Sequence, residues 1–193
     1  MILYHGSNTK GLTVLEPRLA DHGRPYVYLA TLEAVALFYL CNAVERPWYW
    51  FPYGFEGGDF QTPVYHELYP DALREVSEGV EGSLYWAETE ETQVLPLKNI
   101  PCARLAVEPL PIAGCREVPD AYALLLEWER QGKLRVNRYE DKTPAQLNWW
   151  WRDIGAYLHE KRMIETPDCA YAVFVREKFP WVWEQYAVEC EKS

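Results

Sequence analysis

Short apolar runs alternate with polar and turn-forming residues along the chain, and this pattern predicts a mixed α+β protein. Runs rich in Val, Ile, Leu and Tyr that end at Gly, Pro, Asn or Ser are typical of β-strands. The predicted strands cover residues 2–4, 25–30, 64–68, 83–87, 103–107, 115–118 and 134–139. All of them lie in the first 141 residues, so we expect the sheet there.

Helical spacing of apolar residues and capping signals predict helices between and after these strands. Thr143 before Pro144 supplies an N-cap and a proline at the first helical position, and Thr166 before Pro167 repeats this signal. The predicted helices cover residues 31–42 (capped by Thr31), 70–77, 119–131, 143–162 and 181–189. We therefore expect an α+β domain over residues 1–141 and a helical appendage over residues 142–193 that packs on it.

Residues 47–63 have neither a helical nor a strand period, yet they carry seven aromatic side chains. So many rings predict an ordered loop. Two interpretations remain open: a hydrophobic cluster that pins a long loop, or a lid over a binding pocket. The run Trp149–Trp151 predicts packing between appendage and body.

Composition and charge exclude several classes of function. The 193 residues carry 19 basic and 29 acidic side chains, a formal charge of −10. Strong binding to nucleic acid or to an anionic membrane needs a positive surface and is not expected. The N-terminus does not read as a signal peptide, and no apolar run is long enough to span a bilayer. The expectation is a soluble cytoplasmic protein whose 15% aromatic residues form stacking surfaces or a Trp-rich core.

The five cysteines and four histidines are scattered, without a CxxC or HExxH motif. An odd, widely spaced set of cysteines argues against a disulfide framework and fits a reducing cytosol. We therefore predict free thiols and no metal site.

Three features near the N-terminus combine into a candidate site. His5-Gly6-Ser7 follows the first predicted strand, Tyr28 lies in the second, and Tyr39 follows eleven residues later on a helix. The segment LYHGS and the segment YVYLAT, followed by an alanine-rich helix with a tyrosine, resemble motifs of the ADP-ribosyltransferase superfamily. The similarity is to its His-Tyr-Glu branch, typified by diphtheria toxin and the poly(ADP-ribose) polymerases, and it covers about 40 of the 193 residues.

The resemblance implies an ADP-ribosyltransferase-like mixed β-sheet with flanking helices, and NAD as the substrate. It implies that His5 contacts the 2′-hydroxyl of the nicotinamide ribose, that the Gly6 backbone meets the carboxamide, and that Tyr28 and Tyr39 flank the nicotinamide ring. A ring face attracts the cationic nicotinamide by roughly 0.5–2 kcal/mol. The implied dinucleotide-binding residues are His5, Gly6, Ser7, Tyr28, Ala30 and Tyr39.

Cleavage of the nicotinamide–ribose bond develops positive charge on the ribose, which a nearby carboxylate stabilises. Glu108 follows enough strands to take this role, while Glu67 lies in an aromatic context like the family's Y-N-E-Y. Glu88 is a third candidate. We favour Glu108 slightly over Glu67, and the predicted catalytic set is His5, Tyr28 and one of these two glutamates.

Two other functions stay open beside ADP-ribosyl transfer to a protein or nucleic-acid acceptor. The open glutamate assignment, and Ala36 where the family often has serine, favour a catalytically silent module that binds a nucleotide or a protein. An RNA 2′-phosphotransferase-like enzyme of the same fold is disfavoured by the charge of −10. A local patch of Lys10, Arg18 and Arg24 could still bind the diphosphate of a dinucleotide.

Overall fold

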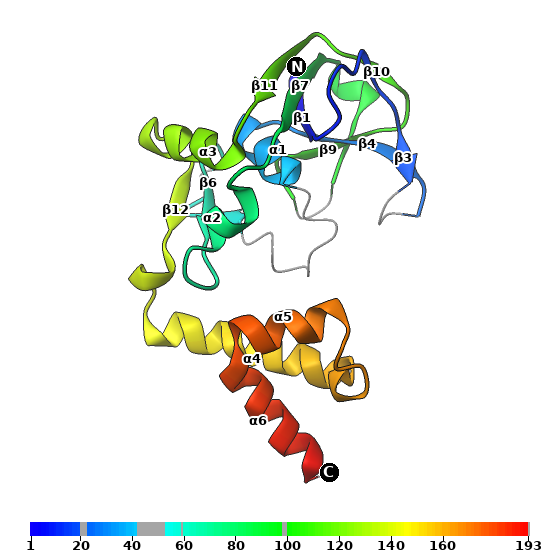
Figure 1. Cartoon of the computed structure of the whole chain (residues 1–193). Coiled ribbons are helices and arrows are strands. Elements are labelled where there is room, and N and C mark those ends of the chain that lie inside the picture. Colours follow the sequence, from blue (N-terminus) through cyan, green and yellow to red (C-terminus); the bar gives the residue numbers. More distant parts are fainter. Residues whose placement is uncertain (20–22, 42–52, 59, 98–99, 193) are drawn as a thin grey trace.

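The computed structural model confirms an α+β architecture in which a large antiparallel sheet carries helices on one face (Figure 1). It describes residues 1–19, 23–41, 53–58, 60–97 and 100–192. The more specific expectation, an ADP-ribosyltransferase-like fold, stays a prediction.

The main sheet has seven strands. Six follow the order β11-β7-β1-β4-β9-β8, and the seventh, β3, pairs with the first residues of β4. Every pairing in it is antiparallel. Its strands are β1 (Ile2–Ser7), β3 (Arg18–Leu19), β4 (Pro25–Ala30), β7 (Gly82–Glu88), β8 (Leu95–Pro96), β9 (Ala103–Ala106) and β11 (Gly114–Val118). The predicted strand at 25–30 is confirmed to the residue, and those at 2–4, 83–87, 103–107 and 115–118 are confirmed within a few residues.

Two smaller sheets complete the β structure. One joins β2 (Val14–Leu15) to β10 (Leu110–Pro111), and the other has the order β12 (Arg135–Asn137), β6 (Pro63–His66) and β5 (Tyr53–Phe55). The pair β12–β6 is parallel. The strands predicted at 64–68 and 134–139 are therefore present in shorter form, as β6 and β12.

The helices are α1 (Glu33–Leu40), α2 (Ala72–Ser77), α3 (Ala121–Arg130), α4 (Pro144–Glu160), α5 (Ala170–Lys178) and α6 (Pro180–Glu191), with 3₁₀ turns at Glu91–Gln93, Tyr139–Asp141 and Met163–Glu165. Thr143 caps α4 as predicted, in a capping box with Gln146. No helix within the described residues is long and apolar enough to cross a lipid bilayer.

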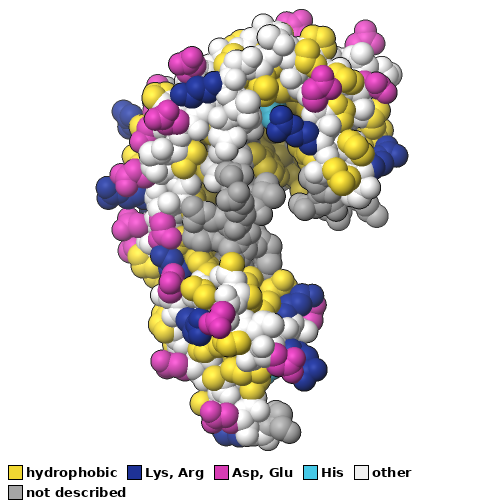
Figure 2. Space-filling model, turned by 45° about the vertical axis from the view of Figure 1, so that its right-hand side comes forward, with side chains coloured by type: hydrophobic (Ala, Val, Ile, Leu, Met, Phe, Trp, Pro, Cys, Tyr) yellow, Lys and Arg dark blue, Asp and Glu magenta, His cyan; other side chains and the backbone are white. Residues whose placement is uncertain are grey.

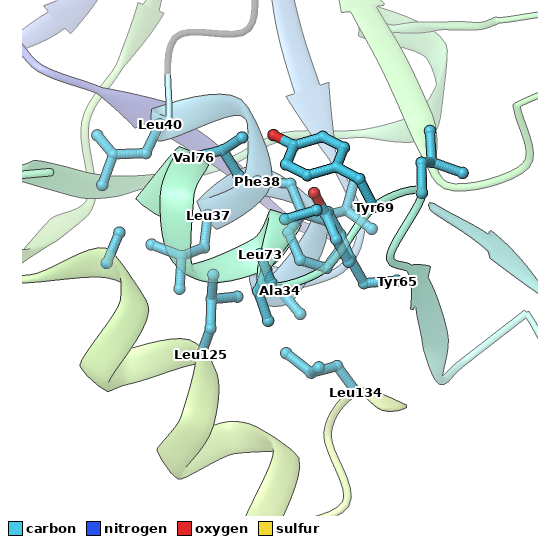
Figure 3. Close-up of a cluster of buried hydrophobic side chains, with 14 of the residues drawn as sticks. Ala34, Leu37, Phe38, Leu40, Tyr65, Tyr69, Leu73, Val76, Leu125 and Leu134 are labelled. Atoms are coloured by element: carbon cyan, nitrogen blue, oxygen red, sulfur yellow. The ribbon is translucent and has the colours of Figure 1, made fainter. Parts of the chain in front are cut away.

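Two apolar clusters lie on opposite faces of the main sheet because successive side chains of β1 point to opposite sides. Leu3 is fully buried in the smaller cluster, whereas Tyr4 packs against the larger one under α1. Figure 3 shows the larger cluster, where side chains from α1, α2, α3 and β6 converge. Its labelled members are Ala34, Leu37, Phe38, Leu40, Tyr65, Tyr69, Leu73, Val76, Leu125 and Leu134.

The larger cluster continues into the C-terminal helices, since Ile154, Leu158 and Phe179 belong to it. The ring of Tyr69 meets the edge of Phe174 at 5.8 Å and of Phe179 at 6.3 Å between centroids. The helices α4–α6 therefore share one apolar core with residues 1–141, and contact between the two parts is not limited to the peptide chain that links them.

Of the three consecutive tryptophans of α4, two pack against the core and one is exposed to solvent. Trp150 and Trp151 pack against the larger cluster, as expected, and Trp151 meets Trp181 edge to face at 5.1 Å. Trp149 is 67% exposed and lies beside Trp150. The prediction that this run packs appendage against body therefore does not extend to Trp149.

The predicted cap at Thr31 is wrong. The N-cap of α1 is Leu32, which has no side-chain cap, and the helix ends at Leu40 rather than at residue 42. The backbone N–H of Thr31 donates to the carbonyl of Cys102 at 2.8 Å, so this residue still extends the pairing with β9. A contact across the sheet therefore delays the helix start.

The second threonine–proline signal is also wrong as a helix start. Helix α5 begins at Ala170, where the Cys169 sulfur accepts from the N–H of Ala172. The N–H of Thr166 donates to Met163 O, and the N–H of Cys169 to Thr166 O, both at 3.1 Å. Two successive tight turns occupy the segment that the signal predicts as helical.

The aromatic segment 47–63 contains a strand that its sequence does not predict. Within it, Tyr53–Phe55 forms β5 and pairs with β6. Residues 47–52 and 59, which make up much of the predicted loop or lid, lie outside the described residues. The strand β5 is formed by hydrogen bonds to a partner strand rather than by a local pattern.

Close packing of α1 on β1 depends on Gly6. A Cβ atom at this position would lie 2.1 Å from the Ala36 carbonyl oxygen and 3.0 Å from Leu40 N. Both are backbone atoms of a buried helix, so neither can move aside without displacing α1. Position 6 therefore requires glycine, because any side chain there would clash with the backbone of α1.

We predict that Gly6→Ala destabilises the fold by about 3 kcal/mol, because the added methyl group overpacks a rigid contact. Gly54→Ala is the matched control, since its Cβ would meet nothing closer than His66 Nε2 at 4.0 Å, and it should stay within about 0.5 kcal/mol of the wild type. Urea unfolding measures both. Equal stabilities of the two variants would contradict this account of Gly6.

Candidate functional site

The main sheet opens between β1 and β4. Both strands have six residues, yet their register contains the single pair Tyr4↔Ala30. By contrast, β1 pairs with β7 along its whole length, from Ile2↔Glu88 to Ser7↔Ser83. Beyond Tyr4 the two central strands therefore separate, and backbone groups of β4 need other partners.

His5 supplies one such partner. Its Nδ1 lies 2.8 Å from the carbonyl oxygen of Tyr28. A carbonyl can only accept, so Nδ1 carries the proton and donates it, and in the neutral ring Nε2 is left as an acceptor. The structure thus brings together His5 and Tyr28, two of the residues that the sequence singles out.

The surroundings of His5 keep its ring neutral. Burial lowers the pKa of His5 below its ordinary value, and the positive charge of Arg18 lowers the pKa further, while the hydrogen bond to the Tyr28 backbone opposes these effects. A neutral ring retains the lone pair on Nε2. The geometry suits acceptance of a hydrogen bond from a hydroxyl group.

Aromatic and cationic side chains continue from Tyr28 along β4. The rings of Tyr28 and Tyr26 meet edge to face at 6.2 Å, and the guanidinium of Arg24 lies 4.9 Å from the centre of the Tyr26 ring. Arg18 on β3 is the register partner of Tyr26. In Figure 2 a small area of histidine surface lies beside a basic side chain at the rim of a hollow.

Tyr39 lies in the last turn of α1 and is 43% exposed. Its hydroxyl is 3.3 Å from that of Tyr53, and the two rings meet edge to face at 6.4 Å. Burial raises the pKa of both hydroxyls, and for Tyr53 the neighbouring Tyr39 raises it further. Both phenols therefore stay protonated at neutral pH. Sequence reasoning missed Tyr53, whose only signal is its place in the aromatic segment.

Three predicted binding residues have structural tasks. Gly6 lies beneath α1, as described above. The Ser7 hydroxyl accepts from Thr9 N at 3.1 Å and so shapes the turn after β1. Ala30 is 3% exposed and pairs with both Tyr4 and β9. These residues border the opening between β1 and β4, because Ala30 belongs to the last register pair and Gly6 and Ser7 follow it on β1.

Glu67 is an internal brace. It is 3% exposed, and its two carboxylate oxygens accept from the backbone N–H groups of Leu73 at 3.2 Å and Tyr139 at 3.3 Å. The guanidinium of Arg138 lies 3.9 Å away. The carboxylate therefore joins the end of β6, the start of α2 and the turn after β12, and its position follows the smaller sheet rather than the sheet that carries His5.

Glu108 lies in an exposed turn directly after β9, the strand beside β4. Within the described part of the chain its carboxylate has no hydrogen bond or ion pair. The positions of β9 opposite Tyr28 and Ala30 are occupied by Leu105 and Ala103. The carboxylate of Glu108 is thus uncommitted, and the β9 positions opposite Tyr28 and Ala30 are apolar.

Glu88 lies at the other end of β1 from Gly6, because its register partner is Ile2. It lines a shallow pocket of about 510 Å³ with Met1, Ile2, Thr89, Glu90 and Gln93. This pocket and the opening at His5 are separate places on the sheet. Nowhere in the described ranges do three or more His, Cys, Asp or Glu side chains gather as they would to hold a metal ion.

Comparison of the chain with protein-family models, with curated proteins and with solved structures found no match.

We predict that His5 titrates below pH 6.5 in the folded protein, the ordinary value for histidine. The unfolded chain then binds the proton more readily, so the contribution of His5 to stability is present above about pH 6.5 and is lost as the pH falls through that value toward the folded pKa. NMR titration of the ring, assigned with His5→Gln, measures it. A titration midpoint above 6.5 would mean a protonated ring without an acceptor at Nε2.

We predict that Glu67→Ala destabilises the fold by about 2–4 kcal/mol, since the buried backbone N–H of Leu73 and the half-buried N–H of Tyr139 lose their acceptor. Glu108→Ala should change the free energy of unfolding by less than about 0.5 kcal/mol. Chemical denaturation compares the two directly. A Glu67→Ala variant as stable as the wild type would show that the two hydrogen bonds of Glu67 do not stabilise the fold.

Proposed function

We propose that this protein binds NAD as an ADP-ribosyltransferase-like enzyme, cleaves its nicotinamide–ribose bond and transfers ADP-ribose to an acceptor. The observation that carries the proposal is the hydrogen bond from His5 Nδ1 to the Tyr28 carbonyl where β1 and β4 separate. It orients the ring with Nε2 as an acceptor, and Nε2 would receive a hydrogen bond from the 2′-hydroxyl of the nicotinamide ribose.

Tyrosine rings suit the cationic half of the substrate. The backbone of Tyr28 holds the His5 ring, and Tyr39 with Tyr53 forms an aromatic surface at the end of α1. Contact of a ring face with the nicotinamide cation is worth roughly 0.5–2 kcal/mol.

In the proposed reaction the acceptor's nucleophilic atom forms a bond to C1′ of the ribose as the C1′–nitrogen bond breaks. The electron pair of the broken bond goes to nicotinamide, which leaves as a neutral molecule, and the acceptor's proton goes to solvent. A carboxylate stabilises the positive charge on the ribose in the transition state. Glu108 fits this role better than Glu67, because the Glu67 carboxylate already holds two backbone donors.

A catalytically silent module that binds NAD or ADP-ribose is the second candidate. It is favoured by the apolar residues Leu105 and Ala103 opposite Tyr28 and Ala30 on the neighbouring strand. Either function fits a reducing compartment such as the cytoplasm, because all five cysteines are free thiols.

We expect the wild type to release nicotinamide from NAD and His5→Ala to release it about 100-fold more slowly, because the ribose loses its positioning contact. Tyr39→Ala should lower the rate about tenfold through the lost ring contact. His159→Ala is the control, since that exposed ring pairs with Glu189 on the C-terminal helices, and it should keep the wild-type rate. Chromatographic assay of nicotinamide measures all four proteins.

The outcomes separate the two candidates. Activity that survives both site substitutions would overturn the assigned site. Binding of NAD in calorimetry without nicotinamide release would favour the silent module, provided that His5→Ala weakens this binding.

A further inference from the structure

A polar cluster connects the ends of β6 and β12 in the three-stranded sheet. His66 and Asn137 are register partners there, and His66 Nδ1 lies 3.3 Å from Asn137 Nδ2. The ammonium of Lys142 donates to the carbonyl oxygens of Asn137 at 2.8 Å and Arg138 at 3.3 Å. We propose that this cluster is an acid-sensitive switch, in which a proton on His66 breaks its hydrogen bond with Asn137 and loosens the pairing of β6 with β12. The proposal is independent of NAD binding.

Lys142 sets the direction of the Asn137 side-chain amide. Its ammonium lies 3.5 Å from Asn137 Oδ1, and an ammonium can only donate. The amide oxygen therefore faces Lys142, because the opposite orientation would bring two donor groups together. The amide nitrogen then faces His66 and donates to Nδ1. In the neutral ring of His66 the proton is thus on Nε2.

A protonated His66 does not fit this arrangement. Both ring nitrogens of a histidinium are donors, so Nδ1–H would meet the NH₂ group of Asn137. Rotation of the amide would restore an acceptor for the ring, but it would turn the NH₂ group toward the ammonium of Lys142. In either case one hydrogen bond is lost and a donor is left without an acceptor. Protonation of His66 therefore weakens the contacts between the two strand ends.

The charges around His66 also favour the neutral ring. Burial lowers the pKa of His66, and the positive charges of Lys142 and Arg135 lower it further. Glu56 raises it, but this carboxylate also forms an ion pair with Arg135 at 3.3 Å. Since the folded pKa lies below the ordinary value of 6.5, the stabilising contribution of neutral His66 is present above about pH 6.5. It is lost as the pH falls through that value toward the folded pKa.

The pairing that His66 supports lies where the chain passes from the sheets to the C-terminal helices. The N–H of Glu67 donates to the Asn137 carbonyl at 3.0 Å, and the N–H of Tyr139 donates to the Glu67 carboxylate at 3.3 Å. Both hydrogen bonds connect the same two strand ends as His66 and Asn137. From there the chain continues through the turn at Tyr139–Asp141 into α4. Opening at His66 therefore acts on this connection and leaves the main sheet paired.

Amide hydrogen exchange followed by NMR tests the proposal on the full chain. Between about pH 7 and about pH 5 we expect the protection factors of the Glu67 and Tyr139 amides to fall about tenfold, through the loss of one hydrogen bond. Amides of β7, between β1 and β11 in the main sheet, should keep their protection. His66→Asn supplies an uncharged acceptor and should abolish the fall. His159→Asn, which replaces an exposed histidine, is the matched control and should behave like the wild type.

Asn137→Asp gives a second measurement, because its carboxylate can accept from both protonated His66 and Lys142. We expect this variant to raise the pKa of His66 above its wild-type value in an NMR titration and to remove the fall in protection. An unchanged pKa of His66 in Asn137→Asp would overturn the proposal. Full protection of the wild-type Glu67 and Tyr139 amides at about pH 5 would also overturn it, and so would an equal fall in His66→Asn or in the amides of β7.

Discussion

The structure around the candidate site depends on one hydrogen bond, from His5 Nδ1 to the carbonyl of Tyr28. Central strands of a sheet normally satisfy each other's backbone groups. Here β1 and β4 separate after a single register pair, and a side chain satisfies a carbonyl that the separation leaves without a strand partner. The same bond fixes which nitrogen of the ring carries the proton. Stability of the opened sheet and the chemistry of the ring therefore have a common cause.

The parts of the fold that could be predicted from the sequence are those with a local cause. The strand at 25–30 has a β-forming run, and Thr143-Pro144 caps its own helix. The start of α1 could not be predicted, because it is set by a hydrogen bond from Thr31 to Cys102, 71 positions along the chain. The strand β5 likewise depends on its partner β6.

The same division applies to the candidate site. Local motifs indicated His5 and Tyr28, which the structure joins. The brace formed by Glu67 is invisible in the sequence, because one of its partners, Tyr139, lies 72 positions away. Aromatic residues around Glu67 suggested a resemblance to a catalytic motif, but they are equally the setting of a buried carboxylate that needs two backbone donors. Tyr53 was missed because its strand has no local signal.

Buried and exposed carboxylates in this protein do different work. A carboxylate that already accepts two backbone hydrogen bonds, as Glu67 does, would have to break them to face a developing positive charge, and the fold would lose its brace at that moment. An exposed carboxylate such as Glu108 costs the fold nothing when it turns toward a substrate, but it needs the substrate to fix its position. An enzyme built this way would depend on tight binding elsewhere, at the histidine and the tyrosine rings, to bring the reacting carbon to the carboxylate.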